Sequence, residues 1–285
     1  MKSNLNTLAI VGSGIMAGGI ADVAASAGHP VIIKARSQSS ADGAVSIVSK
    51  SLSRRVKKEK ITQENADEIA ARISTTLSYE DLADVDLVIE TVAEDKGIKR
   101  EVFGELDRIC KPEAILATNT STLPVTELAM ATKRPSSVCG IHFFNPANVM
   151  ELVEIVVPDV CDEDVVEAVT EFVTECGKSP VRVLDRAGFV VNALLFPYLN
   201  NAARMAEAGT ASREDIDIAM KGGCNFPMGP LALLDLVGLD TSVSILRTLA
   251  ESFKDPNYEP VPLLCELVEQ GHLGRKTGRG LFTYD

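Results

Sequence analysis

Two residues in one stretch of the sequence have side chains suited to proton transfer. His142 lies near the end of a short apolar run, and Glu154 lies in the next run of strand character. A histidine at the rim of a sheet is a natural general acid or base near neutral pH. A carboxylate paired with the ring fixes its tautomer and favours its protonated form. These residues indicate an acid–base pair, but a structural histidine that caps a loop fits the pattern equally well.

Polar side chains also follow a second apolar run. Residues 117–122 read Ala-Thr-Asn-Thr-Ser-Thr and continue directly from the run Ile115–Ala117. Small hydroxyl and amide groups at the end of a strand can bind polar atoms of a ligand. The sequence alone slightly favours the other interpretation, a turn that caps a helix beginning near Pro124. Asn192 is a third candidate, because it is an amide near the start of an otherwise apolar helical segment.

A glycine-rich turn near the start of the chain predicts a dinucleotide site. The strand-like run Leu8–Val11 ends at Gly12, and Gly14 precedes an alanine-rich helical segment. Gly12 allows a sharp turn, Gly14 lets a pyrophosphate approach the main chain and the helix N-terminus, and Ala17 still permits close helix–strand packing. The pattern G-x-G-x-x-A is weak alone, but the preceding strand, the following helix and a second strand at Val31–Ile33 supply its context.

The chain pattern predicts an α/β fold. From Leu5 to about Leu184, short β-rich runs alternate with helical segments, which implies crossover units on a parallel sheet with helices on both faces. The predicted strands are Leu8–Val11, Val31–Lys34, Ile73–Thr75, Leu87–Ile89, Ile115–Ala117, Val138–Ile141, Leu152–Val156 and Val181–Leu184. We expect a doubly wound Rossmann-type domain over residues 1–185, followed by an all-α domain over residues 186–285.

Composition and charge exclude several classes of protein. The 285 residues are 46% hydrophobic, which is enough for a large core in two domains. The formal net charge of −12 argues against a nucleic-acid partner. No apolar run approaches the roughly 20 residues that span a bilayer. The pattern of a secretory signal is missing, and the cysteines are scattered, so we expect a cytoplasmic protein with reduced thiols and no metal site.

A local basic stretch stands out against the acidic total. This stretch is residues 50–60, which read Lys-Ser-Leu-Ser-Arg-Arg-Val-Lys-Lys-Glu-Lys. It belongs to the segment Asp42–Arg72, which is predicted to form a helical hairpin. Taken alone, such a charge run is most often a solvated helix face. An anionic small ligand, which needs only a local basic patch, is the other interpretation.

Together these motifs resemble the 3-hydroxyacyl-CoA dehydrogenase family, especially its bacterial 3-hydroxybutyryl-CoA dehydrogenases. The resemblance covers nearly the whole chain and rests on the segments GSGIMAGGIA, LVIETVAED, ATNTST, GIHFFNP, MELVE, DRAGFVVNALLFPYLN, FPMGPLALLDLVGLD and GRKTGRGLFTY. It implies an NAD(P)-dependent oxidoreductase. The enzyme would transfer a hydride between a nicotinamide and a short-chain 3-hydroxyacyl or 3-ketoacyl thioester.

The resemblance also implies roles for individual residues. His142 is expected to take the hydroxyl proton, and Glu154 to stabilise the imidazolium. Ser121 and Asn192 are expected to hold the reacting oxygen or the thioester carbonyl. Contacts with the cofactor are expected from Gly12, Gly14, Ile15, Met16, Glu94, Lys99, Asn119 and Asn145.

The resemblance extends to the substrate handle and the assembly. The basic hairpin matches the family's clamp for the thioester handle, with Lys50, Arg54 and Lys57 able to meet CoA phosphates. The C-terminal helices correspond to the family's dimerisation domain, so a homodimer is expected.

Two departures from the family pattern bear on specificity. The second strand leads into Ala35 and Arg36, with Ala35 where the family carries an acid that binds the adenosine ribose. Loss of the carboxylate removes repulsion toward a 2′-phosphate, and Arg36 can pair with that phosphate, so we expect NADP(H) to be preferred over NAD(H). Glu151 stands where many relatives carry lysine. Relatives that act on hydroxyacyl groups carried by acyl carrier protein in secondary metabolism therefore remain an alternative.

Two other classes share this architecture. The β-hydroxyacid dehydrogenases act on free acids through a lysine, but the matching helix over residues 188–195 contains none. A non-catalytic NAD(P)-binding structural or sensing relative would lack at least one of the four residues assigned to proton transfer and substrate binding. All four are present, so we expect an active enzyme.

Overall fold

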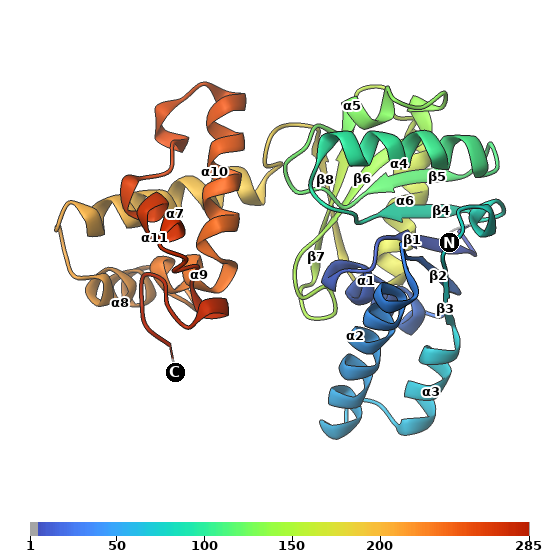
Figure 1. Ribbon diagram of the computed structural model, residues 1–285, viewed down its shortest axis with the longest axis horizontal. Helices are drawn as coiled ribbons and strands as arrows, with labels where there is room; N and C mark the ends of the chain where they lie inside the picture. Colours follow the sequence, from blue (N-terminus) through green and yellow to red (C-terminus); the bar gives the residue numbers. More distant parts are fainter. Residues whose placement is uncertain (1–4, 285) are drawn as a thin grey trace. The chain divides into compact units, whose positions relative to one another are not determined.

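The computed structural model describes residues 5–284 and contains two compact units, the first ending at Asp185 and the second beginning at Arg186 (Figure 1). Each unit has its own apolar core. Within the described residues, no helix is both long and apolar enough to cross a membrane. The same described residues contain no cluster of His, Cys, Asp and Glu that could hold a metal ion.

The first unit is built on a β-sheet that has eight strands in the described part of the chain. The strands are β1 (Leu8–Val11), β2 (Val31–Lys34), β3 (Ile73–Thr76), β4 (Leu87–Glu90), β5 (Ile115–Thr118), β6 (Val138–Phe143), β7 (Leu152–Val157) and β8 (Ser179–Leu184). Their order is β3-β2-β1-β4-β5-β6-β7-β8. The chain leaves β1 toward β2 and later returns to pair β4 on its other side. The carboxyl ends of β1 and β4 therefore form a topological switch point, where α/β sheets bind ligands.

The pairing of β6 with β7 departs from the parallel sheet expected from the sequence. Strands β1 to β6 pair in parallel, but β6 and β7 are antiparallel. Residues 144–151, which join them, contain no helix and are too few for a parallel crossover. The antiparallel register sets His142 directly opposite Glu154.

Six helices of the first unit connect its described strands. They are α1 (Ile15–Ser26), α2 (Gln38–Lys57), α3 (Gln63–Ala71), α4 (Lys96–Ile109), α5 (Val125–Ala129) and α6 (Glu163–Glu175), with 3₁₀ turns at Glu80–Leu82 and Pro135–Ser137. The hairpin of α2 and α3 extends away from the sheet, as Figure 1 shows in blue and cyan. It begins four residues before the predicted Asp42 because Ser37 caps α2 with a capping box.

The second unit is helical in its described residues. Its helices are α7 (Val191–Glu207), α8 (Arg213–Cys224), α9 (Pro230–Val237), α10 (Leu239–Phe253) and α11 (Pro262–Glu269), with 3₁₀ turns at Pro256–Tyr258 and Arg275–Thr277. Ser212 caps α8, because its hydroxyl accepts a hydrogen bond from the Asp215 amide at 3.1 Å. Leu199, Leu234 and Leu246 are fully buried in the core of this unit.

Candidate active site

Strands β6 and β7 place the predicted acid–base pair. Opposed residues of an antiparallel pair project from one face with β-carbons about 5 Å apart, so His142 and Glu154 are neighbours by register. The Nδ1 atom of His142 lies 2.8 Å from Oε2 of Glu154, and the residues are only 5% and 1% exposed. The contact with the carboxylate engages Nδ1 and so fixes the orientation of the imidazole. The imidazole and carboxylate that the sequence singled out are thus in direct contact.

The turn after β1 has the shape that a dinucleotide needs. Gly12 has a φ of +132°, and a β-carbon there would collide with Thr91, so only glycine fits. Among the described residues, a β-carbon at Gly14 would meet nothing within 4 Å, and no side chain caps α1. The first-turn amides of α1 are therefore suited to a pyrophosphate. Ile15 is 65% exposed beside this turn, whereas Met16 packs against the core.

The end of β2 presents an arginine at the start of a long helix. Ala35 is buried at 1% exposure, and the following Arg36 is exposed. Ser37 then caps α2, accepting a hydrogen bond from the Ser40 amide at 3.3 Å. Arg36 therefore lies at the positive end of a helix dipole, and this part of the chain is suited to an anionic group.

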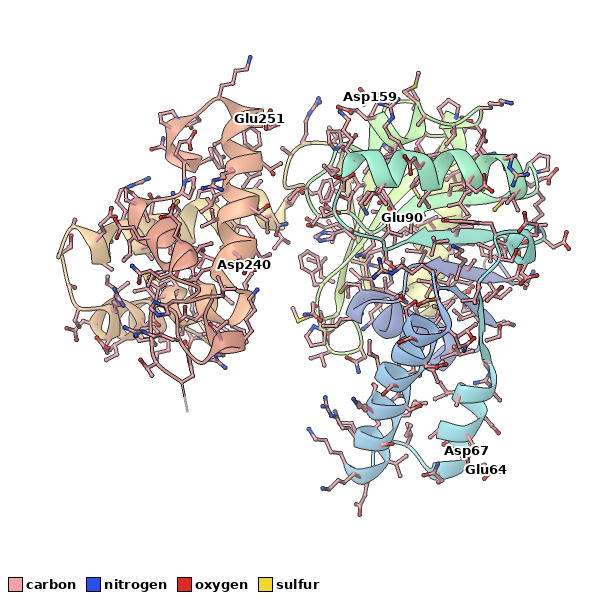
Figure 2. The ribbon with its side chains drawn as sticks, viewed as in Figure 1. Glu64, Asp67, Glu90, Asp159, Asp240 and Glu251 are labelled. Atoms are coloured by element: carbon pink, nitrogen blue, oxygen red, sulfur yellow. The ribbon has the colours of Figure 1, made fainter. Side chains whose placement is uncertain are left out.

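A buried ion pair lies behind the turn after β4. The Nζ atom of Lys99 lies 2.8 Å and 2.9 Å from the two carboxylate oxygens of Glu90, and both residues are at most 1% exposed. The Thr118 hydroxyl donates to the same carboxylate at 2.7 Å. Figure 2 shows Glu90 within the sheet, in contrast with Glu64 and Asp67, which project from α3. The charge of Lys99 is therefore fixed in place by Glu90.

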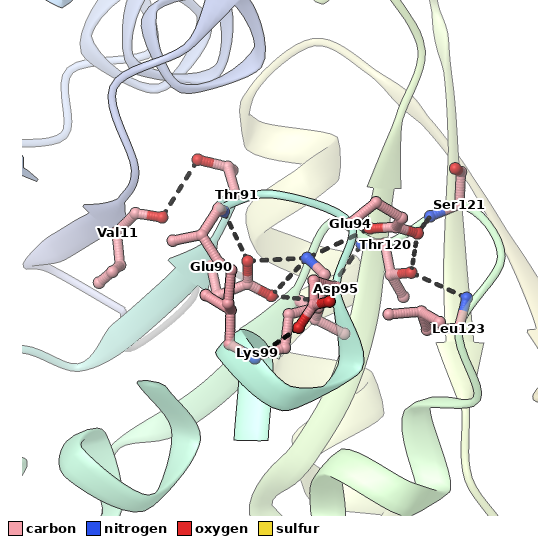
Figure 3. A network of polar contacts seen from close by, with 12 residues as sticks. Val11, Glu90, Thr91, Glu94, Asp95, Lys99, Thr120, Ser121 and Leu123 are labelled. Atoms are coloured by element: carbon pink, nitrogen blue, oxygen red, sulfur yellow. Dashed lines mark hydrogen bonds and ion pairs between the residues drawn. The ribbon is translucent and has the colours of Figure 1, made fainter. Parts of the chain in front are cut away.

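Glu94 joins this ion pair to the polar segment after β5 (Figure 3). Its Oε2 lies 3.3 Å from Lys99 Nζ, and its Oε1 accepts hydrogen bonds from the Ser121 amide at 3.1 Å and from the Thr120 hydroxyl. Thr122 adds two more, from its amide at 3.3 Å and its hydroxyl at 3.1 Å. Burial raises the pKa of Glu94, but the Lys99 charge and the hydrogen bonds from Thr120 and Ser121 outweigh burial, so the pKa lies below its ordinary value.

The ends of the same segment are held by other contacts. Asn119 accepts a hydrogen bond from the Phe143 amide at 2.9 Å, which ties the segment to β6 beside His142. The N-terminus of α5 is capped by Asp185, which accepts from the Val125 amide at 3.0 Å. The helix cap that the Asn/Ser/Thr run suggested is thus supplied by a residue outside that run.

The first unit also contains a pocket of about 730 Å³. Its walls come from α1, from the basic arm of α2 and from the loop after β6, and they include Ile15, Gly19, Lys50, Arg54, Lys58 and Asn145. Lys57 lies exposed in the last turn of α2. The pocket thus adjoins both the glycine turn and the loop that follows His142.

Two adjacent arginines of α2 have different environments. The Nη1 atom of Arg55 lies 2.9 Å from the buried Asp22, whose other oxygen accepts the Ser51 hydroxyl at 2.5 Å. Ser51 in turn accepts a hydrogen bond from Asn148 at 2.7 Å. Arg54 is exposed and lines the pocket. We therefore assign Arg55 to holding α2 against α1, and Arg54 to the pocket.

Two further sequence candidates lie elsewhere. Asn192 is in the second unit, at the second position of α7, and is 7% exposed. Glu151 is exposed just before β7, where its carbonyl accepts the Ser179 amide at 2.8 Å.

The sequence alone did not predict roles for Glu90, Thr120 and Asp22. A signal existed for Glu90, an acid that ends an otherwise apolar strand and precedes a lysine by nine residues. Asp22 was likewise visible as the one acid in an alanine-rich helix. Thr120 was quoted only as part of a polar run, because nothing in its type distinguishes it from its neighbours.

The first unit combines a mixed sheet, a glycine turn suited to a dinucleotide and a buried His–Glu pair, and a helical unit follows it in the chain. This combination is typical of a nicotinamide-dependent dehydrogenase. The family model described as "3-hydroxyacyl-CoA dehydrogenase, NAD binding domain" matches residues 7–186, and the C-terminal domain model of the same family matches residues 188–284. The chain belongs to the 3-hydroxyacyl-CoA dehydrogenase family. It is accordingly an oxidoreductase that uses a nicotinamide cofactor, which confirms the enzyme class and the fold expected from the sequence.

Similar proteins share the whole length of the chain. A 3-hydroxybutyryl-CoA dehydrogenase of Mycobacterium tuberculosis is 46% identical over 286 residues, covering 100% of both chains. One from Clostridioides difficile is 45% identical, covering 98% of this chain and 99% of its own. The crystal structure of (S)-3-hydroxybutyryl-CoA dehydrogenase from Ralstonia eutropha superposes with a TM-score of 0.96 at 41% identity, covering 99% of this chain and 100% of its own.

Proposed function

We propose that the protein interconverts a short-chain 3-hydroxyacyl-CoA and the corresponding 3-ketoacyl-CoA at the His142–Glu154 pair. The observation that carries the proposal is the buried 2.8 Å contact between these side chains at the rim of the sheet. The names of the similar proteins, which are 3-hydroxybutyryl-CoA dehydrogenases, support a short acyl group and CoA as its carrier.

The chemistry follows from the geometry of the pair. In oxidation, Nε2 of His142 takes the proton of the C3 hydroxyl, and Glu154 stabilises the imidazolium that forms. In reduction, the imidazolium returns the proton to the oxygen on C3. When bound, the nicotinamide accepts or supplies the hydride at C3. Ser121 and, from the family resemblance, Asn192 are proposed to hold the reacting oxygen or the thioester carbonyl.

The cofactor is proposed to lie along the carboxyl ends of β1, β2, β4 and β5. The turn at Gly12 and Gly14, with Ile15 and Met16, would receive the pyrophosphate, because it offers open space and the first amides of α1. Further contacts are proposed from Glu94, Asn119 and Asn145. Lys99, which is 1% exposed and bonded to Glu90 and Glu94, is proposed to act on the cofactor only by holding Glu94 in place.

We propose NADP(H) as the preferred cofactor. The support is the buried Ala35 in the position of the ribose-binding acid and the exposed Arg36 at the N-terminus of α2. A carboxylate at position 35 would repel a 2′-phosphate, whereas a guanidinium forms charge-assisted hydrogen bonds with it.

The Arg36→Ala variant is expected to lose about 10- to 100-fold in kcat/KM for NADPH, the worth of hydrogen bonds to a charged group. The kcat/KM for NADH should change little, because that cofactor carries no 2′-phosphate. Steady-state kinetics with both cofactors measures the ratio. An unchanged ratio in the variant contradicts the role given to Arg36.

Lys50 and Arg54 are proposed to bind the phosphates of the CoA handle, with Lys57 as a further contact. Both line the pocket that adjoins the loop after His142. A double variant, Lys50→Ala with Arg54→Ala, is expected to raise KM for acetoacetyl-CoA about tenfold, because it removes two cations that meet phosphates. Acetoacetyl-pantetheine, which lacks those phosphates, is the matched control substrate and should show an unchanged KM. An equal rise with both substrates contradicts the assignment.

We also propose a homodimer formed through the second unit. The support is the family resemblance of its helices, together with several exposed apolar side chains, among them Leu194, Ile218 and Leu236 at 72%, 60% and 49% exposure. Sedimentation equilibrium of the wild-type protein, and of a Leu194→Asp variant, tests this assembly.

Reduction of acetoacetyl-CoA, assayed side by side with NADPH and NADH, tests the proposed function. Turnover that is faster with NADPH supports both the reaction and the cofactor. Faster turnover with NADH keeps the reaction and overturns the cofactor preference. Absence of turnover with either cofactor, together with turnover of acetoacetyl-acyl carrier protein, establishes the alternative handle.

A further inference from the structure

We infer that Glu94 is a positioning residue for substrate binding, because it holds the turn that carries Ser121. The family resemblance assigns Glu94 to the cofactor alone, so this role is additional. The inference rests on the proposed function, in which Ser121 binds the thioester substrate.

The hydrogen bonds of Glu94 converge on the middle of the turn. One carboxylate oxygen accepts from Thr120, Ser121 and Thr122, and in Figure 3 the Ser121 hydroxyl points away from that oxygen. Glu94 therefore holds the backbone amide of Ser121, while the Ser121 hydroxyl points away from the Glu94 carboxylate. Contacts of Asn119 and Asp185 fix the two ends of the segment, so Glu94 acts where those contacts do not reach.

Lys99 fixes Glu94 from the other side. An ammonium has three donor hydrogens, and three carboxylate oxygens lie within 3.3 Å of Lys99 Nζ, two from Glu90 and one from Glu94. Because Lys99 is 1% exposed, its charge is committed to these carboxylates. Asp95, between Glu94 and α4, caps that helix by accepting the Ile98 amide at 2.9 Å, which further limits the movement of Glu94. A rigid support for the Ser121 turn thus extends from the interior of the sheet to the substrate-binding hydroxyl.

A substitution at Thr120 can weaken the contact between Glu94 and the Ser121 turn without changing either Glu94 or Ser121. The Thr120 hydroxyl bonds to Glu94 and accepts the Leu123 amide at 3.0 Å, and its side chain is 1% exposed. The Thr120→Val variant keeps the size of the side chain and loses both contacts, together with the longer one from the Thr122 amide at 3.4 Å. We expect kcat/KM for acetoacetyl-CoA to fall about tenfold, the effect of one hydrogen bond to a charged group, with the Kd of the cofactor unchanged. Thr120→Ser should restore the wild-type value.

A double-mutant cycle with Ser121→Ala separates positioning from general damage. If Thr120 acts through Ser121, Thr120→Val has no further effect on kcat/KM in the Ser121→Ala background. Thr170→Val is the matched control, since it removes a threonine hydroxyl that donates at 2.7 Å within α6, and it should leave the kinetics unchanged. The same double-mutant cycle can be built from the Kd of acetoacetyl-CoA, which calorimetry measures in the absence of turnover.

The outcomes are distinguishable. Additive losses for Thr120→Val and Ser121→Ala in an active enzyme overturn the inference and leave the proposed function intact. A loss confined to the Kd of the cofactor overturns it as well, because Glu94 would then serve the cofactor alone. A wild-type protein that neither binds nor reduces acetoacetyl-CoA overturns the proposed function and this inference together.

Discussion

The His142→Gln variant is expected to lose about a thousandfold in kcat, the usual contribution of a positioned general acid or base. A glutamine amide can still donate a hydrogen bond toward Glu154, which lies 2.8 Å from the native ring. It cannot take up or release a proton near neutral pH, so the oxygen on C3 has no partner for proton transfer. Steady-state rates of acetoacetyl-CoA reduction provide the measurement.

Binding of the cofactor should survive this substitution. The glycine turn after β1 and the end of β2 are separate elements from β6, so a fluorescence titration should give the wild-type Kd for the cofactor. His29→Gln is the matched control. His29 packs on Phe172 and lies 3.5 Å from Glu175, outside the proposed site, and its replacement should leave kcat unchanged. A His142→Gln enzyme within tenfold of the wild-type rate contradicts the assignment of the base.

The Lys99→Met variant is expected to lower the free energy of unfolding by about 3–5 kcal/mol, the cost of breaking a buried ion pair on one side. The reason is that Glu90 is 0% exposed and would keep a charge with no cation beside it. Urea unfolding followed by circular dichroism measures the change. Adding Glu90→Gln to Lys99→Met should recover much of the loss, because the second substitution removes the uncompensated charge.

Lys96→Met is the matched control on the same helix. Lys96 and Glu127 form an ion pair whose side chains are 50% and 45% exposed, and such a pair contributes at most about 1 kcal/mol. If Lys99→Met costs no more than Lys96→Met, the interior ion pair does not support the site as we argue.

The sheet could be predicted from sequence because its strands are short apolar runs bounded by turn residues. Seven of the eight predicted strands start at the residue that the structure gives, and the exception, β8, begins two residues earlier than predicted. The direction of β7 could not be predicted from hydrophobicity alone, since parallel and antiparallel strands at the centre of a covered sheet are equally apolar. The direction of β7 follows instead from the connection over residues 144–151, which is too short for a parallel crossover.

Helix ends were harder to predict than helices. Apolar residues recur at helical spacing across Leu231–Phe253, but Gly238, with a φ of 102°, separates α9 from α10. A lone glycine within a periodic pattern does not reveal whether its backbone is helical, and tertiary contacts decide.

In the proposed site, too, some residues could be predicted from the sequence and others could not. His142 and Glu154 were found because their types are rare and their chemistry is specific. The Glu90–Lys99–Glu94 cluster joins residues from β4, from α4 and from the turn between them, and it reaches the turn after β5 only in the folded chain. The residue types at those positions show that the groups are charged. Which hydrogen bonds each charged group makes depends on three-dimensional packing.

Transfer of deuterium tests the central claim most directly. Acetoacetyl-CoA would be reduced with NADPH carrying two deuterium atoms at C4 of the nicotinamide, and the product examined by mass spectrometry and NMR. We predict 3-hydroxybutyryl-CoA with a single deuterium on C3, and loss of that product in the His142→Gln variant. Product without deuterium at C3, or the same labelled product from the variant at the wild-type rate, would contradict hydride transfer assisted by His142 and Glu154.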